Sequence, residues 1–321
     1  MSRPSLLITR PLPLSVVQRL QASYDVTVNS EKALDAEGLR AALKSYDALS
    51  PTITDKLDAA LLQEGLKTRI VANFGAGIEH IDLSAAKRAN LVVTNTPDAL
   101  TDATAELTLL LVLMVSRRAG EGERMVRAEK WVGWAPTQLL GSAVKGKTLG
   151  LVGFGRIAKE AARRIRSALD MRIAYHSRTR ASVDEESALD AEYHESLESL
   201  LAVADVVSLH CPGGAATRHL INAKTLAHMK PTAILINTAR GSVVDEAALA
   251  TALAGRQIAA AGLDVYEREP VVLAALRELE NVVLLPHLGS ATLEARTAMG
   301  MQMADNLDAF FAGRAPPNRV A

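Results

Sequence analysis

The sequence predicts an α/β protein with two parallel β-sheets, and three observations lead to this prediction. Apolar runs of strand length alternate with amphipathic runs of helix length along the chain, as repeated βα units require. The runs form two series, separated by an irregular segment around residues 128–148. At 321 residues, the chain is long enough for two domains that each bury a core.

The first series occupies the N-terminal third. Two stretches of helical pattern, residues 15–23 and 82–90, lie between strand candidates. The strand candidates are residues 5–9, 25–28, 46–50, 69–74 and 91–95. We expect them to form the first parallel sheet.

A long apolar helix is expected over residues 101–118. Thr101 and Asp102 are suited to its N-cap, and two arginines are suited to its C-terminus. Its most apolar stretch, residues 107–115, is too short to span a bilayer and predicts a buried helix. We expect this helix to bridge the two domains.

The segment 128–148 contains glycine, proline and both tryptophans, which predicts an exposed loop or a short helix. The second series follows it, and a final helix is expected over residues 292–313. The strand candidates of this series are residues 148–153, 171–176, 205–210, 233–239, 259–265 and 282–287.

Composition narrows the classes of partner. Basic and acidic residues balance at 36 each, so no nucleic-acid or membrane partner is expected. The single cysteine excludes an internal disulfide and a multi-cysteine zinc site. The prolines near the N-terminus make a poor signal peptide, and we expect a cytoplasmic protein without a bound metal.

A dinucleotide-binding loop is predicted where residues 148–153 end. Gly153, Gly155 and Ala158 form a G-x-G-x-x-A pattern between a strand and a helix. The first glycine permits the turn, the second admits a pyrophosphate, and the small third residue packs helix on strand. An ordinary glycine turn is the alternative.

The next strand ends in a basic turn, and this turn predicts the cofactor. An acidic residue about 20 positions after the glycines would favour NAD, but this position holds Ser177, Arg178, Thr179 and Arg180. Hydroxyl and guanidinium groups favour a 2′-phosphate, so we expect NADPH, with NADH possible but weaker. A solvated basic turn is the alternative.

Three polar residues follow late strands: Arg240, Glu269 and His287. Carboxyl ends of parallel strands border a ligand crevice, so the three side chains are expected at one site. An arginine can hold a carboxylate and polarise a carbonyl, and a histidine beside a carboxylate can deliver a proton. They suit reduction of a 2-oxo acid, although each also has a structural explanation, and the chain holds seven histidines.

Longer motifs give a specific resemblance. In order and spacing, the chain resembles the D-isomer-specific 2-hydroxyacid dehydrogenases, and within them the glyoxylate/hydroxypyruvate reductases, through "LGLVGFGRIA", "LINTARGSVVDEAAL", "GLDVYEREP" and "NVVLLPHLGSAT". Two further matches, "NFGAGIEHID" and "VTNTPDALTDATAELTLLL", extend the likeness over most of the chain.

The resemblance implies a catalytic triad of Arg240, Glu269 and His287. Arg240 would bind the carboxylate and carbonyl oxygen of the substrate, His287 would be the general acid, and Glu269 would orient His287. Asp264 would hold the nicotinamide carboxamide, with a strand-end cap as its simpler role.

The resemblance also implies a substrate loop. The N–H groups of Ala76 and Gly77 would take the substrate carboxylate, with Asn73 and Phe74 lining the pocket; a simple glycine turn is the alternative. Trp134 lies in a segment that, in the family, reaches the substrate site of the other subunit of a homodimer. An aromatic loop at any interface is the simpler explanation.

The remaining expected cofactor contacts surround the glycine loop. Cys211 is expected to be a small residue beside the cofactor rather than a nucleophile. These contacts are Thr104, Phe154, Arg156, Ile157, His210, Cys211, Pro212, Thr238, Ala239 and Gly289.

The resemblance implies two Rossmann-like or flavodoxin-like domains with a cleft between them. Residues 1–100 plus 291–321 would bind substrate, and residues 101–290 would bind the dinucleotide. The expected reaction is NADPH-dependent reduction of glyoxylate or hydroxypyruvate to the D-2-hydroxy acid. The alternatives are a broader 2-ketoacid reductase, an enzyme like phosphoglycerate dehydrogenase, or a dinucleotide-sensing corepressor.

Overall fold

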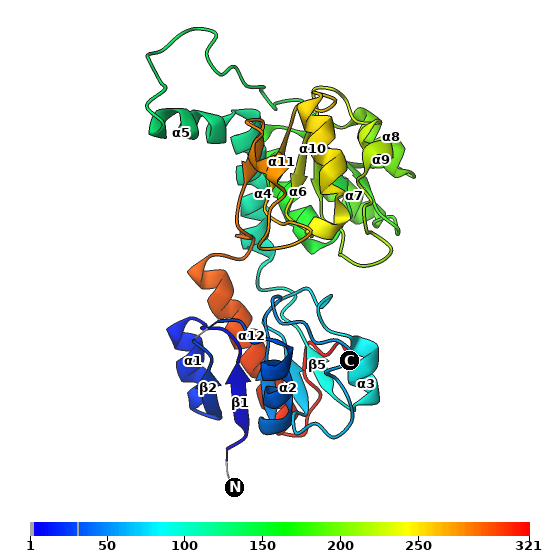
Figure 1. The fold of residues 1–321 in the computed structure, drawn as a ribbon. Coiled ribbons are helices and arrows are strands. Elements are labelled where there is room, and N and C mark those ends of the chain that lie inside the picture. The colour runs from blue at the N-terminus through cyan, green and yellow to red at the C-terminus, as the bar shows by residue number, and fades with distance from the viewer. Residues whose placement is uncertain (1–2, 31) are drawn as a thin grey trace. The chain divides into compact units, whose positions relative to one another are not determined.

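The chain forms two compact units. A computed structural model describes residues 3–30 and 32–321 (Figure 1). Unit 1 comprises residues 1–100 and 290–321, and unit 2 comprises residues 101–289. Residues 1, 2 and 31, which fall in the range expected to bind substrate, lie outside the described residues.

Unit 1 is built on a five-stranded sheet in the order β2-β1-β3-β4-β5. Every strand pair is parallel, as the first series predicts. The strands are β1 (Ser5–Ile8), β2 (Asp25–Val28), β3 (Ala48–Ser50), β4 (Ile70–Ala72) and β5 (Val92–Thr94).

Helices cover both faces of the unit 1 sheet. Leu6 and Ile8 of β1 pack with α1 and α12, whereas Leu7 between them packs with α2 and α3, because successive strand residues point to opposite faces. The helices are α1 (Leu14–Gln21), α2 (Ala36–Ser45), α3 (Leu83–Arg88) and α12 (Leu293–Phe311). The last helix therefore returns to the unit formed by the N-terminal third.

Unit 2 contains a seven-stranded parallel sheet in the order β12-β11-β10-β9-β6-β7-β8. From β6 the strand order runs through β7 and β8 to one edge of the sheet, and from β9 it runs through β10 and β11 to the other edge. Such a switch point, here between β6 and β9, forms a crevice at the carboxyl ends of the strands. The strands are β6 (Thr148–Val152), β7 (Arg172–His176), β8 (Ala191–Tyr193), β9 (Val206–Leu209), β10 (Ile234–Asn237), β11 (Ala260–Leu263) and β12 (Val282–Leu284).

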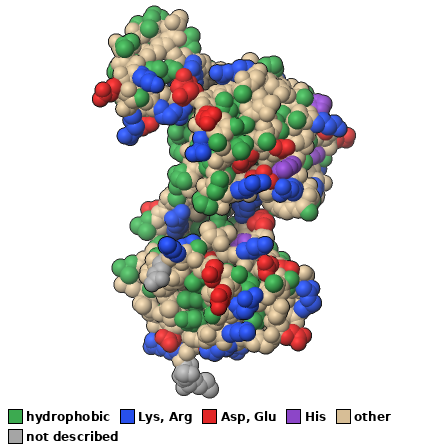
Figure 2. All heavy atoms as spheres, in the orientation of Figure 1, with side chains coloured by type: hydrophobic (Ala, Val, Ile, Leu, Met, Phe, Trp, Pro, Cys, Tyr) green, Lys and Arg blue, Asp and Glu red, His purple; other side chains and the backbone are tan. Residues whose placement is uncertain are grey.

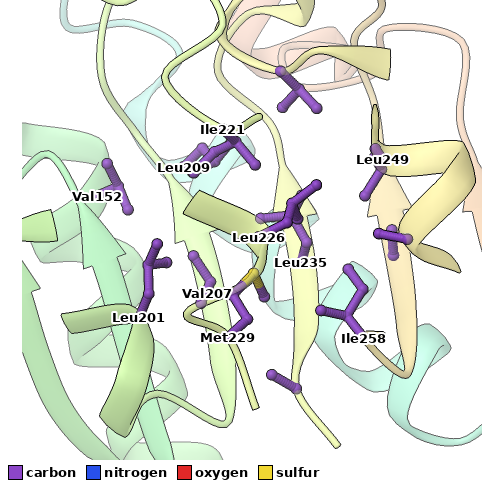
Figure 3. Packing of buried hydrophobic residues seen from close by; sticks show 14 of the residues in the cluster. Val152, Leu201, Val207, Leu209, Ile221, Leu226, Met229, Leu235, Leu249 and Ile258 are labelled. Carbon is purple, nitrogen blue, oxygen red and sulfur yellow. The ribbon is translucent and has the colours of Figure 1, made fainter. Parts of the chain in front are cut away.

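Two cores lie on the two faces of this sheet. One contains Leu201, Val207, Leu226, Leu235 and Leu249, drawn in Figure 3, and packs α8, α9 and α10 onto the sheet. The other packs α4 and α6. The helices are α4 (Thr101–Ser116), α5 (Ala119–Arg127), α6 (Arg156–Leu169), α7 (Val183–Leu189), α8 (Leu197–Val203), α9 (Ala223–Leu226), α10 (Glu246–Ala254) and α11 (Ala274–Arg277), with a 3₁₀ turn at Gly241–Val243.

The ends of the long apolar helix differ from the prediction. α4 begins at Thr101, so Thr101 and Asp102 lie inside its first turn, and the buried Thr101 hydroxyl has no hydrogen-bond partner among the described residues. The predicted N-cap is therefore wrong. Arg117 and Arg118 follow the last turn, where Arg118 turns the chain into α5 with φ 52°. α4 belongs entirely to unit 2.

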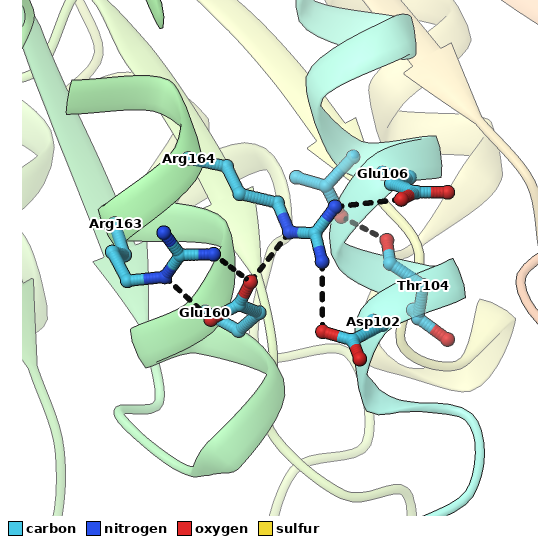
Figure 4. Close-up of polar contacts among 7 residues, drawn as sticks. Asp102, Thr104, Glu106, Glu160, Arg163 and Arg164 are labelled. Atoms are coloured by element: carbon cyan, nitrogen blue, oxygen red, sulfur yellow. Dashed lines mark hydrogen bonds and ion pairs between the residues drawn. The ribbon is translucent and has the colours of Figure 1, made fainter. Parts of the chain in front are cut away.

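Polar contacts fix α4 to α6. Arg164 of α6 donates to Glu106 (2.6 Å) and Asp102 (2.7 Å) of α4 and to Glu160 of its own helix (2.5 Å). Arg163 adds two bonds to Glu160 (Figure 4). The first turn of α4 is thus tied to the helix that follows the glycine loop.

The irregular segment is exposed. Residues 128–147 contain no helix, which confirms the loop prediction, and they project with α5 from unit 2 (Figure 1). The side chains of Val132 and Trp134 are 100% and 81% exposed. On the face shown in Figure 2, basic and acidic side chains are intermingled. None of the described helices is long and apolar enough to cross a membrane.

Candidate active site

The glycine loop has the geometry that a close-approaching phosphate requires. Gly153 adopts φ 89°, and a Cβ at this position would lie 2.9 Å from the carbonyl carbon of His210, so only glycine fits. Gly155 precedes α6, and a Cβ there would meet no atom within 4 Å. Among the residues that the structure describes, no side chain caps the N–H groups at the start of α6. This open helix N-terminus can therefore accept an anion.

The rest of the loop packs inward or begins the helix. Ala158 is fully buried against the strand layer, as the third motif position requires. The ring of Phe154 stacks on Tyr175 with centroids 3.9 Å apart. The ring is therefore nearly buried, and the expected contact of Phe154 with the cofactor stays a prediction. Arg156 and Ile157 form the first turn of α6.

The two arginines predicted to contact a phosphate, Arg178 and Arg180, have different surroundings in the turn after β7. Arg180 bonds both carboxylate oxygens of Glu186 (2.8 and 2.9 Å) and lies 5.2 Å from the ring centre of Tyr193. Its charge is thus neutralised within the protein. Arg178 is exposed and has no ion pair among the described residues, and the Ser177 hydroxyl donates to the Thr179 carbonyl (2.6 Å). Arg178 is therefore the cation best placed for a phosphate.

The segment after β9 borders the glycine loop. His210 accepts or donates a hydrogen bond with Ser208 (2.9 Å), and burial lowers the pKa of His210 to about 4. Burial also raises the pKa of Cys211 to about 11, against a smaller opposing effect of the Arg178 charge. The neutral thiol agrees with the expectation that Cys211 is no nucleophile. Pro212 is exposed beside them.

His287 and Glu269 form a direct pair. His287 Nδ1 lies 2.8 Å from Glu269 Oε2, while Glu269 Oε1 accepts from the N–H of Tyr266 (2.9 Å). Because a carboxylate only accepts, Nδ1 carries the proton and Nε2 is left for another partner. Both side chains are about a third exposed, so Nε2 can reach a small molecule.

The ionisation of Glu269 suits this pairing. Burial acts to raise the pKa of Glu269, but the hydrogen bond and charge of His287, the Tyr266 N–H and the charge of Arg240 outweigh it and leave the pKa below its ordinary value. Glu269 is therefore a carboxylate at neutral pH. The charge of Arg240 acts on Glu269 because both lie at the carboxyl edge of neighbouring strands.

A buried amide fixes the turn that carries Arg240. Asn237, 1% exposed at the end of β10, accepts from the Ala239 N–H (3.0 Å) and donates to the Arg240 carbonyl (3.0 Å). The Thr238 hydroxyl lies 3.0 Å from that of Thr108 in α4. Asn237 was missed at the sequence level, since strand-end asparagines are common in turns.

The Asp264 carboxylate caps a neighbouring loop, and its expected bond to the nicotinamide carboxamide stays a prediction. The carboxylate accepts from the N–H groups of Leu288 (2.6 Å) and Gly289 (2.9 Å), which fixes the loop that carries His287. Burial raises the pKa of Asp264 despite these bonds. The Thr104 hydroxyl donates to the Gly289 carbonyl (3.1 Å), so Thr104 and Gly289 are joined to each other.

The loop after β4 in unit 1 is held from inside. Asn73 is fully buried; its amide donates to the carbonyls of Gly75 (3.0 Å) and Gly77 (2.9 Å), and its oxygen bonds His80 (3.0 Å). The Asn73 side chain therefore shapes this loop from inside, and its expected place beside a substrate pocket stays a prediction. Phe74 is partly exposed.

The expected carboxylate-binding N–H groups are available. Within the part of the chain that the structure describes, the N–H groups of Ala76 and Gly77 donate to no protein acceptor, whereas the Ala76 carbonyl accepts from Asn95 (2.8 Å). An anion on this loop would satisfy both donors. Trp134, the other expected substrate contact, lies in the exposed loop of unit 2.

The fold and these groups define a dinucleotide-binding α/β protein, and comparison with known proteins gives its family. The family model "D-isomer specific 2-hydroxyacid dehydrogenase, NAD binding domain" matches residues 109–289. The chain is 45% identical to a glyoxylate reductase of Thermococcus litoralis, over 99% of this chain and 97% of that protein. It is 39% identical to a glycerate dehydrogenase of Hyphomicrobium methylovorum, over 98% of each.

Solved structures agree. An NADPH-dependent glyoxylate/hydroxypyruvate reductase of Sinorhizobium meliloti, in complex with NADP and malonate, has a TM-score of 0.86 and 36% identity, with 100% of this chain and 97% of that chain covered. The chain therefore belongs to the D-isomer-specific 2-hydroxyacid dehydrogenase family. The predicted resemblance and the two parallel-sheet α/β units are confirmed.

Proposed function

We propose that this protein reduces a small 2-oxo acid, glyoxylate or hydroxypyruvate, to the D-2-hydroxy acid with NADPH. The observation that carries the proposal is the 2.8 Å pair of His287 and Glu269, in the same unit as an open glycine loop. Relatives named glyoxylate reductase and glycerate dehydrogenase support a substrate of this size.

The chain's own residues supply binding and a proton. The nicotinamide, when bound, supplies the hydride. Arg240 binds the substrate carboxylate and polarises the carbonyl oxygen. As negative charge develops on the carbonyl oxygen, His287 donates the Nε2 proton to this oxygen. Glu269 fixes the orientation of the imidazole ring through its bond to Nδ1. In the reverse reaction, Nε2 accepts the proton.

The glycine loop and the basic turn support the proposal that the protein binds NADPH as its cofactor. The N–H groups at the start of α6 take the pyrophosphate, and Arg178, Ser177 and Thr179 take the 2′-phosphate. Ser177 must leave the Thr179 carbonyl to donate to this phosphate. Asp264 can still accept from the nicotinamide carboxamide, because each carboxylate oxygen has two lone pairs.

We assign dinucleotide binding to residues 101–290 and substrate binding to residues 1–100 and 291–321. The N–H groups of Ala76 and Gly77, which donate to no acceptor in the described part of the chain, support the second assignment. We also assign to the cofactor site five residues that lie at the same edge of the unit 2 sheet. They are His210, Pro212, Thr238, Ala239 and Gly289.

The direct test measures NADPH and NADH oxidation with glyoxylate, hydroxypyruvate, pyruvate and 3-phosphohydroxypyruvate. We expect the largest kcat/KM with glyoxylate or hydroxypyruvate and NADPH. Preference for the phosphorylated acid would indicate a phosphoglycerate dehydrogenase, and equal use of bulkier acids a broad reductase. Tight NADPH binding without turnover of any acid would favour the corepressor alternative.

A further inference from the structure

A buried glutamate outside the proposed reaction contacts the segment that carries Glu269. Glu246, the first residue of α10, is 8% exposed, and its Oε1 accepts from the N–H of Glu267 (2.7 Å). Burial raises its pKa, and the Glu267 N–H opposes this effect. A glutamate in the first turn of α10 can interact favourably with the helix dipole while its carboxylate stays hydrated. Burial of this carboxylate has a desolvation cost, so its position against the Glu267 N–H requires another explanation.

The same two segments also meet at Gly241. A Cβ on Gly241 would lie 1.8 Å from the carbonyl carbon of Tyr266 and 2.3 Å from the nitrogen of Glu267. The segment after β10, residues 240–246, therefore contacts residues 266–267 twice, near its first residue and at its last residue. Gly241 provides backbone contact beside Arg240, and Glu246 provides a hydrogen bond five residues later.

Hydrogen bonds connect residues 266–267 to the proposed proton donor, His287. The Tyr266 N–H binds Glu269 Oε1, and Glu269 Oε2 binds His287. Any shift of residues 266–267 would therefore change the distance of Glu269 from both His287 and Arg240. Misplacement by about 1 Å can cost about 100-fold in rate.

We propose that Glu246 is a positioning residue that sets the spacing between Arg240 and the Glu269–His287 pair. This inference rests on the roles given above to Arg240, Glu269 and His287. Glu246 has no contact with a reacting atom in this arrangement; it acts through the backbone of Glu267.

Four variants separate positioning from folding. Glu246→Met keeps the volume but cannot accept a strong hydrogen bond, Glu246→Ala removes the side chain, and Glu246→Gln keeps an accepting oxygen. Asp245→Ala is the matched control, because the Asp245 side chain caps α10 through the N–H groups of Ala247 and Ala248. Among the described residues it forms no hydrogen bond with residues 266–269.

We expect kcat for the 2-oxo acid to fall roughly 10- to 100-fold in Glu246→Met and Glu246→Ala, with NADPH affinity unchanged. Glu246→Gln should recover most of kcat, and Asp245→Ala should lower Tm but retain kcat. A normal kcat in Glu246→Met, an equal loss in Asp245→Ala, or failure of glutamine to restore kcat would overturn the proposal.

A second readout does not depend on activity. Amide hydrogen exchange of the peptide containing residues 264–269 should be faster in Glu246→Met than in wild type and in Asp245→Ala, because only the former frees the Glu267 N–H. Unchanged exchange would refute the positioning role. If wild type reduces no 2-oxo acid but this exchange still rises, the proposed function fails while the hold on the segment stands.

Discussion

His287 shows how a single residue acquires a defined role from its neighbours. Its N–H donates to the Asp264 carbonyl (2.9 Å), the following two N–H groups bind the Asp264 carboxylate, and its ring binds Glu269. The backbone of His287 is held at φ 56°, a conformation that non-glycine residues adopt at a cost. The surroundings thus hold this ring in one place.

His287→Ala should lower kcat by roughly 100-fold or more, since general acid catalysis contributes about 10²–10⁴-fold. NADPH affinity, measured by fluorescence titration, should be nearly unchanged, because the proposed phosphate contacts lie on other loops and Gly289, on the loop of His287, is held through its main chain by Asp264 and Thr104. His228→Ala, at an exposed histidine, is the control and should behave as wild type. Retained activity in His287→Ala would remove it from the role of proton donor.

We expect cofactor choice to depend on two residues of the turn after β7, Ser177 and Arg178. The double variant Ser177→Asp with Arg178→Leu replaces attraction for a 2′-phosphate by repulsion and gives the ribose hydroxyls an acceptor. If contacts to the charged phosphate contribute about 1.5–3 kcal/mol, the ratio of kcat/KM for NADPH over NADH should fall roughly 10- to 100-fold. Arg180→Leu should change this ratio little, because Glu186 already neutralises Arg180. An unchanged ratio in the double variant would refute phosphate recognition by the turn.

The contact between α4 and α6 joins two elements that both carry residues of the proposed dinucleotide site. α6 begins at the glycine loop, and α4 carries Thr104, which binds Gly289. Glu160 is central to the contact: the hydrogen bond from Arg163, against the opposing effect of burial and with added help from Arg164, lowers the pKa of Glu160 to about 2.

Replacement of Glu160 should therefore destabilise the protein in a pH-dependent way. Glu160→Gln should lower the free energy of unfolding by about 1 kcal/mol at pH 7. Because the pKa is lowered from 4.5 to about 2, this contribution is complete above pH 4.5 and is lost as pH falls through about 2. Urea unfolding at pH 7, 5 and 3 measures the difference between the two proteins.

The control for this prediction is Glu195→Gln, at an exposed residue of the same unit. It should match wild type at each pH. A difference for Glu160→Gln that grows as the solution is acidified would have the wrong sign and would contradict the assigned pKa shift.

Unit 2 presents an apolar surface that the other residues of this unit leave uncovered. No residue of α5 is buried, and Val126, Trp131, Val132, Trp134 and Leu140 are each more than half exposed. Exposed apolar patches of this kind mark interfaces. We expect a homodimer formed through α5 and residues 128–147.

Sedimentation velocity should give a mass twice 34.2 kDa for the wild type. Trp134→Ser combined with Val132→Asp should weaken dimerisation by about 30-fold or more, if loss of the tryptophan anchor costs about 2 kcal/mol. Val183→Asp changes a valine that is 75% exposed elsewhere in unit 2, and it should remain dimeric. A monomeric wild type, or dissociation in Val183→Asp, would contradict the proposed interface.

Local sequence patterns predicted most of the elements and the dinucleotide loop. The apolar runs gave eleven of the strand positions, and the spacing of Gly153, Gly155 and Ala158 placed the glycine loop, because these signals lie within short windows of the chain. β8 was not predicted. It is a three-residue edge strand with no fully buried residue, so it lacks the apolar run that marks the others.

The contacts that define the site required the tertiary structure. Glu246 and Glu267 are 21 positions apart and Asp264 and Gly289 are 25 positions apart, and no local pattern records which distant N–H group a carboxylate accepts from. Likewise, the sequence alone did not show that the Asn73 amide bonds the Gly77 carbonyl or that Arg180 pairs with Glu186. The sequence thus determined the residue types and the order of the elements, and the order of strands across each sheet decided which of those residues meet, because parallel strands bring distant segments to one edge.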